Sequence, residues 1–90
     1  MHVTRIEVEN QYYSSDQACH LATVIAYTRH AIVPLACSAY MSPYAQEQDV
    51  RAALICDAVR QLTALDRMRG GIGRIDLAPL ALPRCTRQAA

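Results

Sequence analysis

The sequence predicts a small α+β domain with the element order β-β-β-α-β, in which one long helix packs on one face of an antiparallel sheet. Residues 43–69 carry apolar side chains at three- and four-residue spacing, which is typical of an amphipathic helix. Residues 2–9 and 72–77 alternate between apolar and polar side chains, the period of a strand with one buried face. A chain of 90 residues provides one hydrophobic core. We therefore expect a single domain at residues 1–78 and an irregular C-terminal tail at residues 79–90.

The helix is expected to span residues 43–69. Ser42 is a favourable N-cap, and Pro43 suits the first helical position, where its missing N–H has no helical partner. Gly70 and Gly71 provide a stop. The face predicted to pack on the core contains Leu54, Ile55, Ala58, Val59, Leu62 and Leu65. The face predicted to meet water contains Asp49, Asp57, Arg60 and Gln61.

The first strand, at residues 2–9, is expected to place its side chains on two faces by strict alternation. One face is predicted to carry Thr4, Ile6 and Val8. The other is predicted to carry Val3, Arg5, Glu7 and Glu9. In the last strand, at residues 72–77, Ile75 and Leu77 are expected to face inward, while Arg74 and Asp76 face outward.

Residues 14–30 are compatible with either a helix or a strand. Ser14 and Gln17 have capping-box spacing and apolar residues follow at helical spacing, which would give the alternative order β-α-β-α-β. Residues 23–28 are β-branched and aromatic, which favours a strand. We adopt the strand, so residues 10–17 become a hairpin loop. A third strand at residues 32–41 contains Pro34, which cannot donate to a ladder, so it should lie at an edge, be bulged there or begin afterwards.

The composition is 52% hydrophobic and 19% charged, which is typical of a chain that folds. The most apolar stretch, residues 21–41, is interrupted by Arg29, His30 and Pro34, so no membrane span is expected. The first residues lack the pattern of a secretory leader, which favours the cytoplasm. In that reducing compartment, we expect the four cysteines to be free thiols.

Histidine and cysteine spacings do not match a structural zinc site, so no metal is expected. Gly70, Gly71 and Gly73 follow a helix and precede a strand, whereas a phosphate-binding loop follows a strand and opens a helix. No nucleophile lies in a recognisable catalytic context. We therefore predict no cofactor, no catalytic residue and a protein that is not an enzyme.

Seven of the nine basic residues, all of them arginine, lie in residues 50–90. A basic patch around the end of the helix could contact phosphates, which makes a small nucleic-acid-binding module the alternative function. The arginines predicted to form this patch are Arg60, Arg67, Arg69 and Arg74. The net charge of +1 and the absence of a paired aromatic motif count against it.

Protein binding is the function that the sequence favours most. A sheet covered by one helix leaves its other face or an edge open to a second copy or to another protein, and tyrosine and arginine are enriched in interfaces. Tyr12 and Tyr13, in the expected hairpin loop, are the best local candidates. The chain is similar in general style to small bacterial or phage accessory proteins that occlude or adapt a larger assembly. We therefore expect a regulatory protein-binding module that forms a homodimer.

Overall fold

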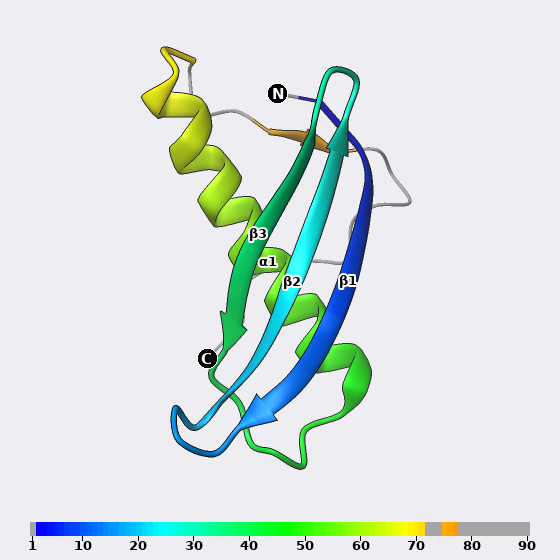
Figure 1. The fold of residues 1–90 in the computed structure, drawn as a ribbon, viewed down its shortest axis with the longest axis vertical. Helices are drawn as coiled ribbons and strands as arrows, with labels where there is room; N and C mark the ends of the chain where they lie inside the picture. The colour runs from blue at the N-terminus through cyan, green and yellow to red at the C-terminus, as the bar shows by residue number, and fades with distance from the viewer. Residues whose placement is uncertain (1, 72–74, 78–90) are drawn as a thin grey trace.

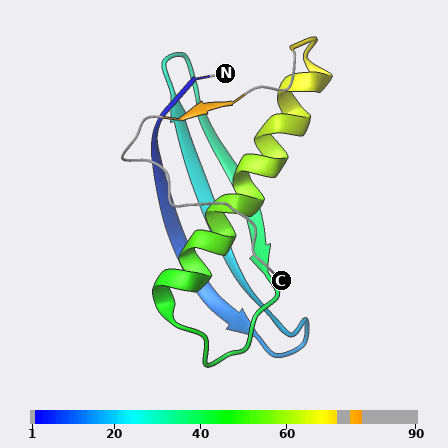
Figure 2. The ribbon, with the colours of Figure 1, turned by 180° about the vertical axis from the view of Figure 1, so that it is seen from behind.

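The computed structural model describes residues 2–71 and 75–77 and confirms the predicted α+β fold with the order β-β-β-α-β. Its elements are β1 (His2–Ser14), β2 (Cys19–Thr28), β3 (Ile32–Ala39), α1 (Glu47–Met68) and β4 (Asp76–Leu77). The sheet order is β3-β2-β1-β4, with β1, β2 and β3 antiparallel and β4 parallel to β1. Figure 1 looks onto an uncovered face of the sheet, and Figure 2 shows α1 lying across the opposite face. Residues 19–28 form a strand, as adopted above.

The hydrophobic core lies between α1 and the covered face of the sheet. Leu54 and Leu62 of α1 are fully buried, and so is Val24 of β2. They pack beside small residues of the sheet such as Ala22 and Ala26. Small side chains on the strands let the helix backbone approach closely, so the leucines fill the space between the layers. The predicted apolar face of the helix is confirmed at Leu54, Ile55, Ala58 and Leu62.

Strict alternation along the first strand was the wrong expectation. The register of β1 with β2 shifts between Val3 and Arg5, so one extra residue lies on β1. Such a bulge reverses which face the following side chains occupy. Val3 is consequently fully buried with Leu62, although alternation placed it on the face opposite Ile6.

The first hairpin also differs from its predicted form. β1 extends to Ser14, so Tyr12 and Tyr13 lie in a strand and not in a loop. A second register shift separates Glu9 from Tyr12, and Asn10 has a φ of 55°. Asparagine tolerates this left-handed conformation better than most residues. The shift interrupts the alternation, which made the strand seem to end early.

The helix begins at Glu47 and not at Pro43. Ser42 is not its N-cap, because the Ser42 hydroxyl accepts a hydrogen bond from the Tyr44 N–H at 3.0 Å and the Ser42 carbonyl accepts one from Ala45. The His20 ring also contacts that carbonyl, with 2.8 Å between Nε2 and the oxygen. The connection from β3 therefore closes a separate turn, fastened to the sheet, before the helix starts.

The predicted helix stop is confirmed. Gly70 has a φ of 88°, and its N–H donates to the Arg67 carbonyl. The Gly71 N–H donates to the Asp66 carbonyl at 2.9 Å. These two bonds form a Schellman motif, in which glycine provides the left-handed residue.

The third strand lies at an edge of the sheet, which is one of the positions that Pro34 allows. Its register with β2 puts Val33, Leu35, Cys37 and Ala39 on the covered face, as predicted. The predictions for residues 72–74 and for the tail at residues 79–90 lie outside the described part of the chain. Within that part, no helix is both long and apolar enough to cross a membrane.

Candidate binding surfaces

The uncovered face of the sheet carries an apolar surface. Residues opposite one another in antiparallel strands share a face, so the register assigns Leu21, Ile25 and Tyr27 of β2 to this side. They are half-buried between their neighbours. Ile32 of β3 and Tyr12 of β1 remain 64% and 58% exposed. Contiguous apolar side chains on an uncovered layer are typical of an interaction surface.

Charged side chains border this apolar surface along β1. The Tyr27 hydroxyl donates a hydrogen bond to Glu7 Oε1 at 2.8 Å, and Arg5 forms an ion pair with the same carboxylate. The Arg5 guanidinium also lies 5.1 Å from the centre of the Tyr27 ring. The hydrogen bond from Tyr27 lowers the pKa of Glu7 most, and the hydrogen bond from Arg5 lowers it further. The hydrogen bond to Glu7 in turn raises the pKa of Tyr27. These contacts hold the three side chains in one arrangement on the open face.

A shallow hollow of about 240 Å³ lies near one end of the uncovered face. Its lining includes Asn10, Tyr12, Leu21 and Ala36, so it adjoins the second register shift of β1. The displaced backbone at Asn10 opens space beside the exposed Tyr12 ring. The face is therefore apolar along its centre and hollowed at one end.

Side chains from α1 occupy part of the outer edge of β3. Asp57 Oδ2 accepts a hydrogen bond from the Ser38 N–H at 3.0 Å, and Gln61 Nε2 donates to the Ala36 carbonyl at 2.8 Å. The backbone N–H and C=O of a strand residue point to the same side of the strand, and this side alternates from one residue to the next. Pro34 therefore points to the same edge as Ala36 and Ser38, and it has no N–H there. Asp57 is buried and paired with Arg60, so the expectation that it faces water is wrong. Asp57 is buried because its carboxylate binds the Ser38 N–H at the edge of β3. Helical periodicity does not reveal this contact.

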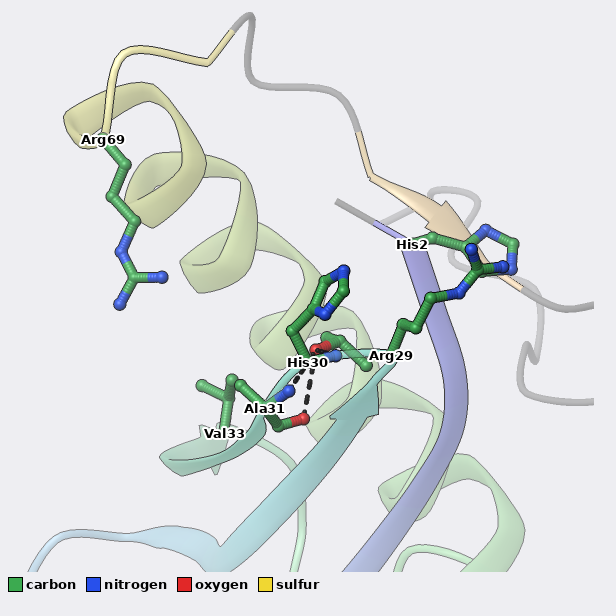
Figure 3. Close-up of a pocket in the computed structure, with 7 residues that line it drawn as sticks. His2, Arg29, His30, Ala31, Val33 and Arg69 are labelled. Atoms are coloured by element: carbon green, nitrogen blue, oxygen red, sulfur yellow. Dashed lines mark hydrogen bonds between the residues drawn. The ribbon is translucent and has the colours of Figure 1, made fainter.

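A second surface, which we call the end pocket, lies where the β2–β3 turn, the start of β1 and the end of α1 meet. Its volume is about 380 Å³. It is lined by His2, Thr28, Arg29, His30, Ala31, Val33 and Arg69. Figure 3 shows the Arg69 side chain extending from the helix end, with His30 and Arg29 rising from the turn. Four of the seven lining residues are arginine or histidine, and none of these seven is acidic.

The turn beside the end pocket is fixed by Thr28. Its hydroxyl oxygen accepts hydrogen bonds from the N–H groups of His30 and Ala31, at 3.3 and 3.0 Å, while the Thr28 N–H donates to the Ala31 carbonyl at 2.8 Å. These bonds set the direction in which Arg29 and His30 leave the backbone. The two exposed side chains are therefore presented from a hydrogen-bonded turn.

The structure separates the residues that the sequence singled out. Tyr12 lies on the uncovered face, whereas Tyr13 packs edge-on against the buried His20 ring, with 4.9 Å between the ring centres. Tyr13 therefore packs over the end of the core. β1 ends at the opposite end of the molecule from the end of α1, so the tyrosines and the helix-end arginines form no common site.

The predicted arginine patch is also divided. Arg60 is paired with Asp57, and Arg69 lines the end pocket with Arg29. Arg67 is exposed in the last turn of α1, and Arg74 lies outside the described residues. Sequence reasoning missed Arg29 and His30 as site residues. Their position in a short turn was the available signal, because side chains at a turn project from the sheet.

The cysteines differ in state. Cys19 and Cys37 are buried free thiols, in agreement with the expectation. Cys56 is half-buried and takes part in a disulfide, so the expectation of four free thiols is wrong there. Cys85 lies outside the described residues.

Cys37 is expected to resist alkylation in the folded protein. Burial raises the pKa of its thiol to about 11, so the reactive thiolate is scarce at pH 8. The protonated form is favoured by folding, so this group's contribution to stability is lost as the pH rises from about 9 to about 11. Iodoacetamide labelling followed by peptide mass spectrometry should find Cys37 unmodified before unfolding and modified in urea. Rapid labelling of the folded protein would contradict its burial.

Among residues 2–71 and 75–77, no group of three or more histidine, cysteine, aspartate or glutamate side chains could hold a metal ion. The two surfaces that remain as candidates are the apolar uncovered face and the basic end pocket. Comparisons with protein-family models, curated proteins and solved structures each found no match for this chain.

Proposed function

We propose that the chain is a non-enzymatic protein-binding module that pairs with a second copy of itself through the uncovered face of its sheet. The observation that carries this proposal is the apolar surface centred on Ile25 and extended by the exposed Ile32. Burying this surface in a symmetric dimer would remove apolar area from water at about 25 cal/mol per Å². The same face of both copies would form the interface, which therefore has to complement itself.

The arrangement of side chains supports such self-complementarity. The register places three rows of residues across β1, β2 and β3. We call them the large row (Arg5, Tyr27 and Ile32), the middle row (Glu7, Ile25 and Pro34) and the small row (Glu9, Thr23 and Ala36). In the proposed dimer, the two-fold axis lies in the interface and runs along the middle row, across the strands. This axis places the large row of each copy against the small row of the other. Bulky side chains then meet small ones.

The charges complement one another in the same arrangement. The axis puts Arg5 of each copy opposite Glu9 of the other, on both sides of the interface. Glu7 lies near its own counterpart, but each Glu7 is already bound by Arg5 and Tyr27 of its own chain. Opposite charges across an interface fix its register more than they add affinity. Stacked sheets cross at about 30°, with about 10 Å between them.

Pairing through the face is favoured over pairing through the β3 edge. Asp57 and Gln61 already bind two backbone groups of that edge. At a third position on the edge, Pro34 has no N–H to donate to an added strand. A strand added to this edge would meet an interrupted ladder. The uncovered face has no comparable obstruction among the described residues.

The wider role we propose is that of an accessory protein that occludes or adapts a larger assembly, of the kind made by bacteria and phages, in the cytoplasm. The disulfide of Cys56 counts against that location, because a disulfide persists in an oxidising compartment and a reducing one opens it.

The substitution Ile25→Lys is expected to dissociate the dimer, weakening it about 100-fold or more. The axis passes through the middle row, so each dimer would bury two lysines against each other at its centre. Sedimentation velocity over a range of concentrations measures the change. Met68→Lys is the matched control, because Met68 is 83% exposed at the end of α1 and should leave the dimer intact.

Charge reversal distinguishes this arrangement from other dimers. Arg5→Glu and Glu9→Arg should each weaken self-association, while a mixture of the two variants should form a heterodimer with both ion pairs restored. The double variant should dimerise again on its own. Circular dichroism checks that each variant is folded. A wild-type protein that stays monomeric at high concentration removes the dimer from the proposal, and reversals without mutual rescue remove the two-fold arrangement.

A further inference from the structure

The end pocket has the composition of an anion site. Arg29 and Arg69 come from the β2–β3 turn and the end of α1, and neither forms an ion pair with another described residue. His2 and His30 add ring nitrogens that can donate hydrogen bonds. By contrast, Arg5 is paired with Glu7 and Arg60 with Asp57. The pocket therefore gathers cationic side chains that have not been neutralised.

The end of α1 beside the pocket is closed by a capping motif. Carbonyls at the end of α1 accept hydrogen bonds from Arg69, Gly70 and Gly71, so the capping motif satisfies them. A helix C-terminus is otherwise unfavourable for an anion. The guanidinium groups of Arg29 and Arg69 are the charges in the pocket lining that favour an anion.

We propose that the end pocket binds phosphate groups. A guanidinium presents a planar set of donors that matches two phosphate oxygens, which an ammonium cannot do. A volume of about 380 Å³ falls in the range of small-ligand sites, so a nucleotide is of suitable size. The phosphates of a nucleic-acid strand have the same chemistry, and the experiment below separates these two sources.

The end pocket is independent of the proposed dimer. Val33 and Thr28, which line the pocket, belong to the covered side of the sheet, whereas the dimer would use the uncovered side. A monomeric variant such as Ile25→Lys should therefore keep the pocket. Failure of one proposal leaves the other standing.

The test measures binding of three probes at low salt: pyrophosphate and ATP by isothermal titration calorimetry, and a fluorescent single strand of about 12 nucleotides by anisotropy. Arg29→Gln and Arg69→Gln should each weaken binding roughly tenfold. Arg51→Gln is the matched control, because it removes the same charge from an exposed position outside the pocket and should change binding less than about twofold.

Binding of ATP or pyrophosphate would identify a nucleotide-like ligand, and binding of the oligonucleotide alone would identify a nucleic-acid strand. Either result with loss in the Arg29→Gln and Arg69→Gln variants supports the site. Two outcomes overturn it. One is that the wild type binds none of the three probes, and the other is that Arg51→Gln weakens binding as much as Arg29→Gln does.

Discussion

Replacing Leu54 by alanine is expected to lower the free energy of unfolding by about 3 kcal/mol. Leu54 is fully buried in the middle of α1 and belongs to the cluster that contains Val24 and Cys37. Its neighbours on the sheet include Ala22 and Ala39, whose side chains are too short to move into the vacated space. Most of the cavity should therefore persist, and a persistent cavity adds to the loss of buried apolar area.

Urea denaturation followed by far-ultraviolet circular dichroism measures this loss. Met68→Ala is the matched control, because it truncates an apolar side chain of the same helix that is 83% exposed. It should change the free energy of unfolding by less than about 0.5 kcal/mol. A Leu54→Ala variant that lost under about 1 kcal/mol would show that α1 does not pack through this residue as the structure describes.

Repeating patterns made the main elements predictable from the sequence. The apolar spacing in α1 arises because one side of the helix is buried along its length, so Leu54 and Leu62 were assigned correctly. The glycines after the helix were predictive for a local reason, since Gly70 adopts the left-handed conformation that ends a helix. In both cases the physical cause lies within a few residues of the pattern.

The errors arose where the structure depends on contacts between distant residues. The register shift after Val3 is a property of the β1–β2 pairing, so alternation along one strand could not reveal it. Ser42 has the residue type of an N-cap, but its carbonyl contacts the ring of His20, which is 22 residues away in the sequence. The start of the helix therefore moved to Glu47.

The candidate surfaces were predictable only in outline. An open face follows from the presence of one helix for one sheet, so it was predictable from the order of the elements. Which side chains occupy that face depends on the register, which is why Tyr12 lies on it and Tyr13 does not. The end pocket joins Arg29 to Arg69 across 40 positions of the chain, and no motif links residues so far apart.

The second large effect is expected at Asp57, where alanine should lower the free energy of unfolding by about 2–3 kcal/mol. The substitution removes the acceptor for the Ser38 N–H and for Gln61 Nε2, at 3.0 and 3.1 Å, and it leaves the edge N–H of β3 without a partner. The ion pair with Arg60 adds little, because the Arg60 side chain is largely exposed. The cost therefore arises mainly from an unsatisfied backbone group.

Asp57→Asn separates these contributions, because an amide oxygen can still accept from Ser38 while the charge is lost. It should cost about 1 kcal/mol, well below the alanine variant. The alanine variant should also aggregate faster, since an edge with a free N–H can pair with another chain. Urea denaturation and light scattering measure the two effects. If asparagine and alanine cost the same, the charge of Asp57, and not its bond to the β3 edge, holds this part of the fold together.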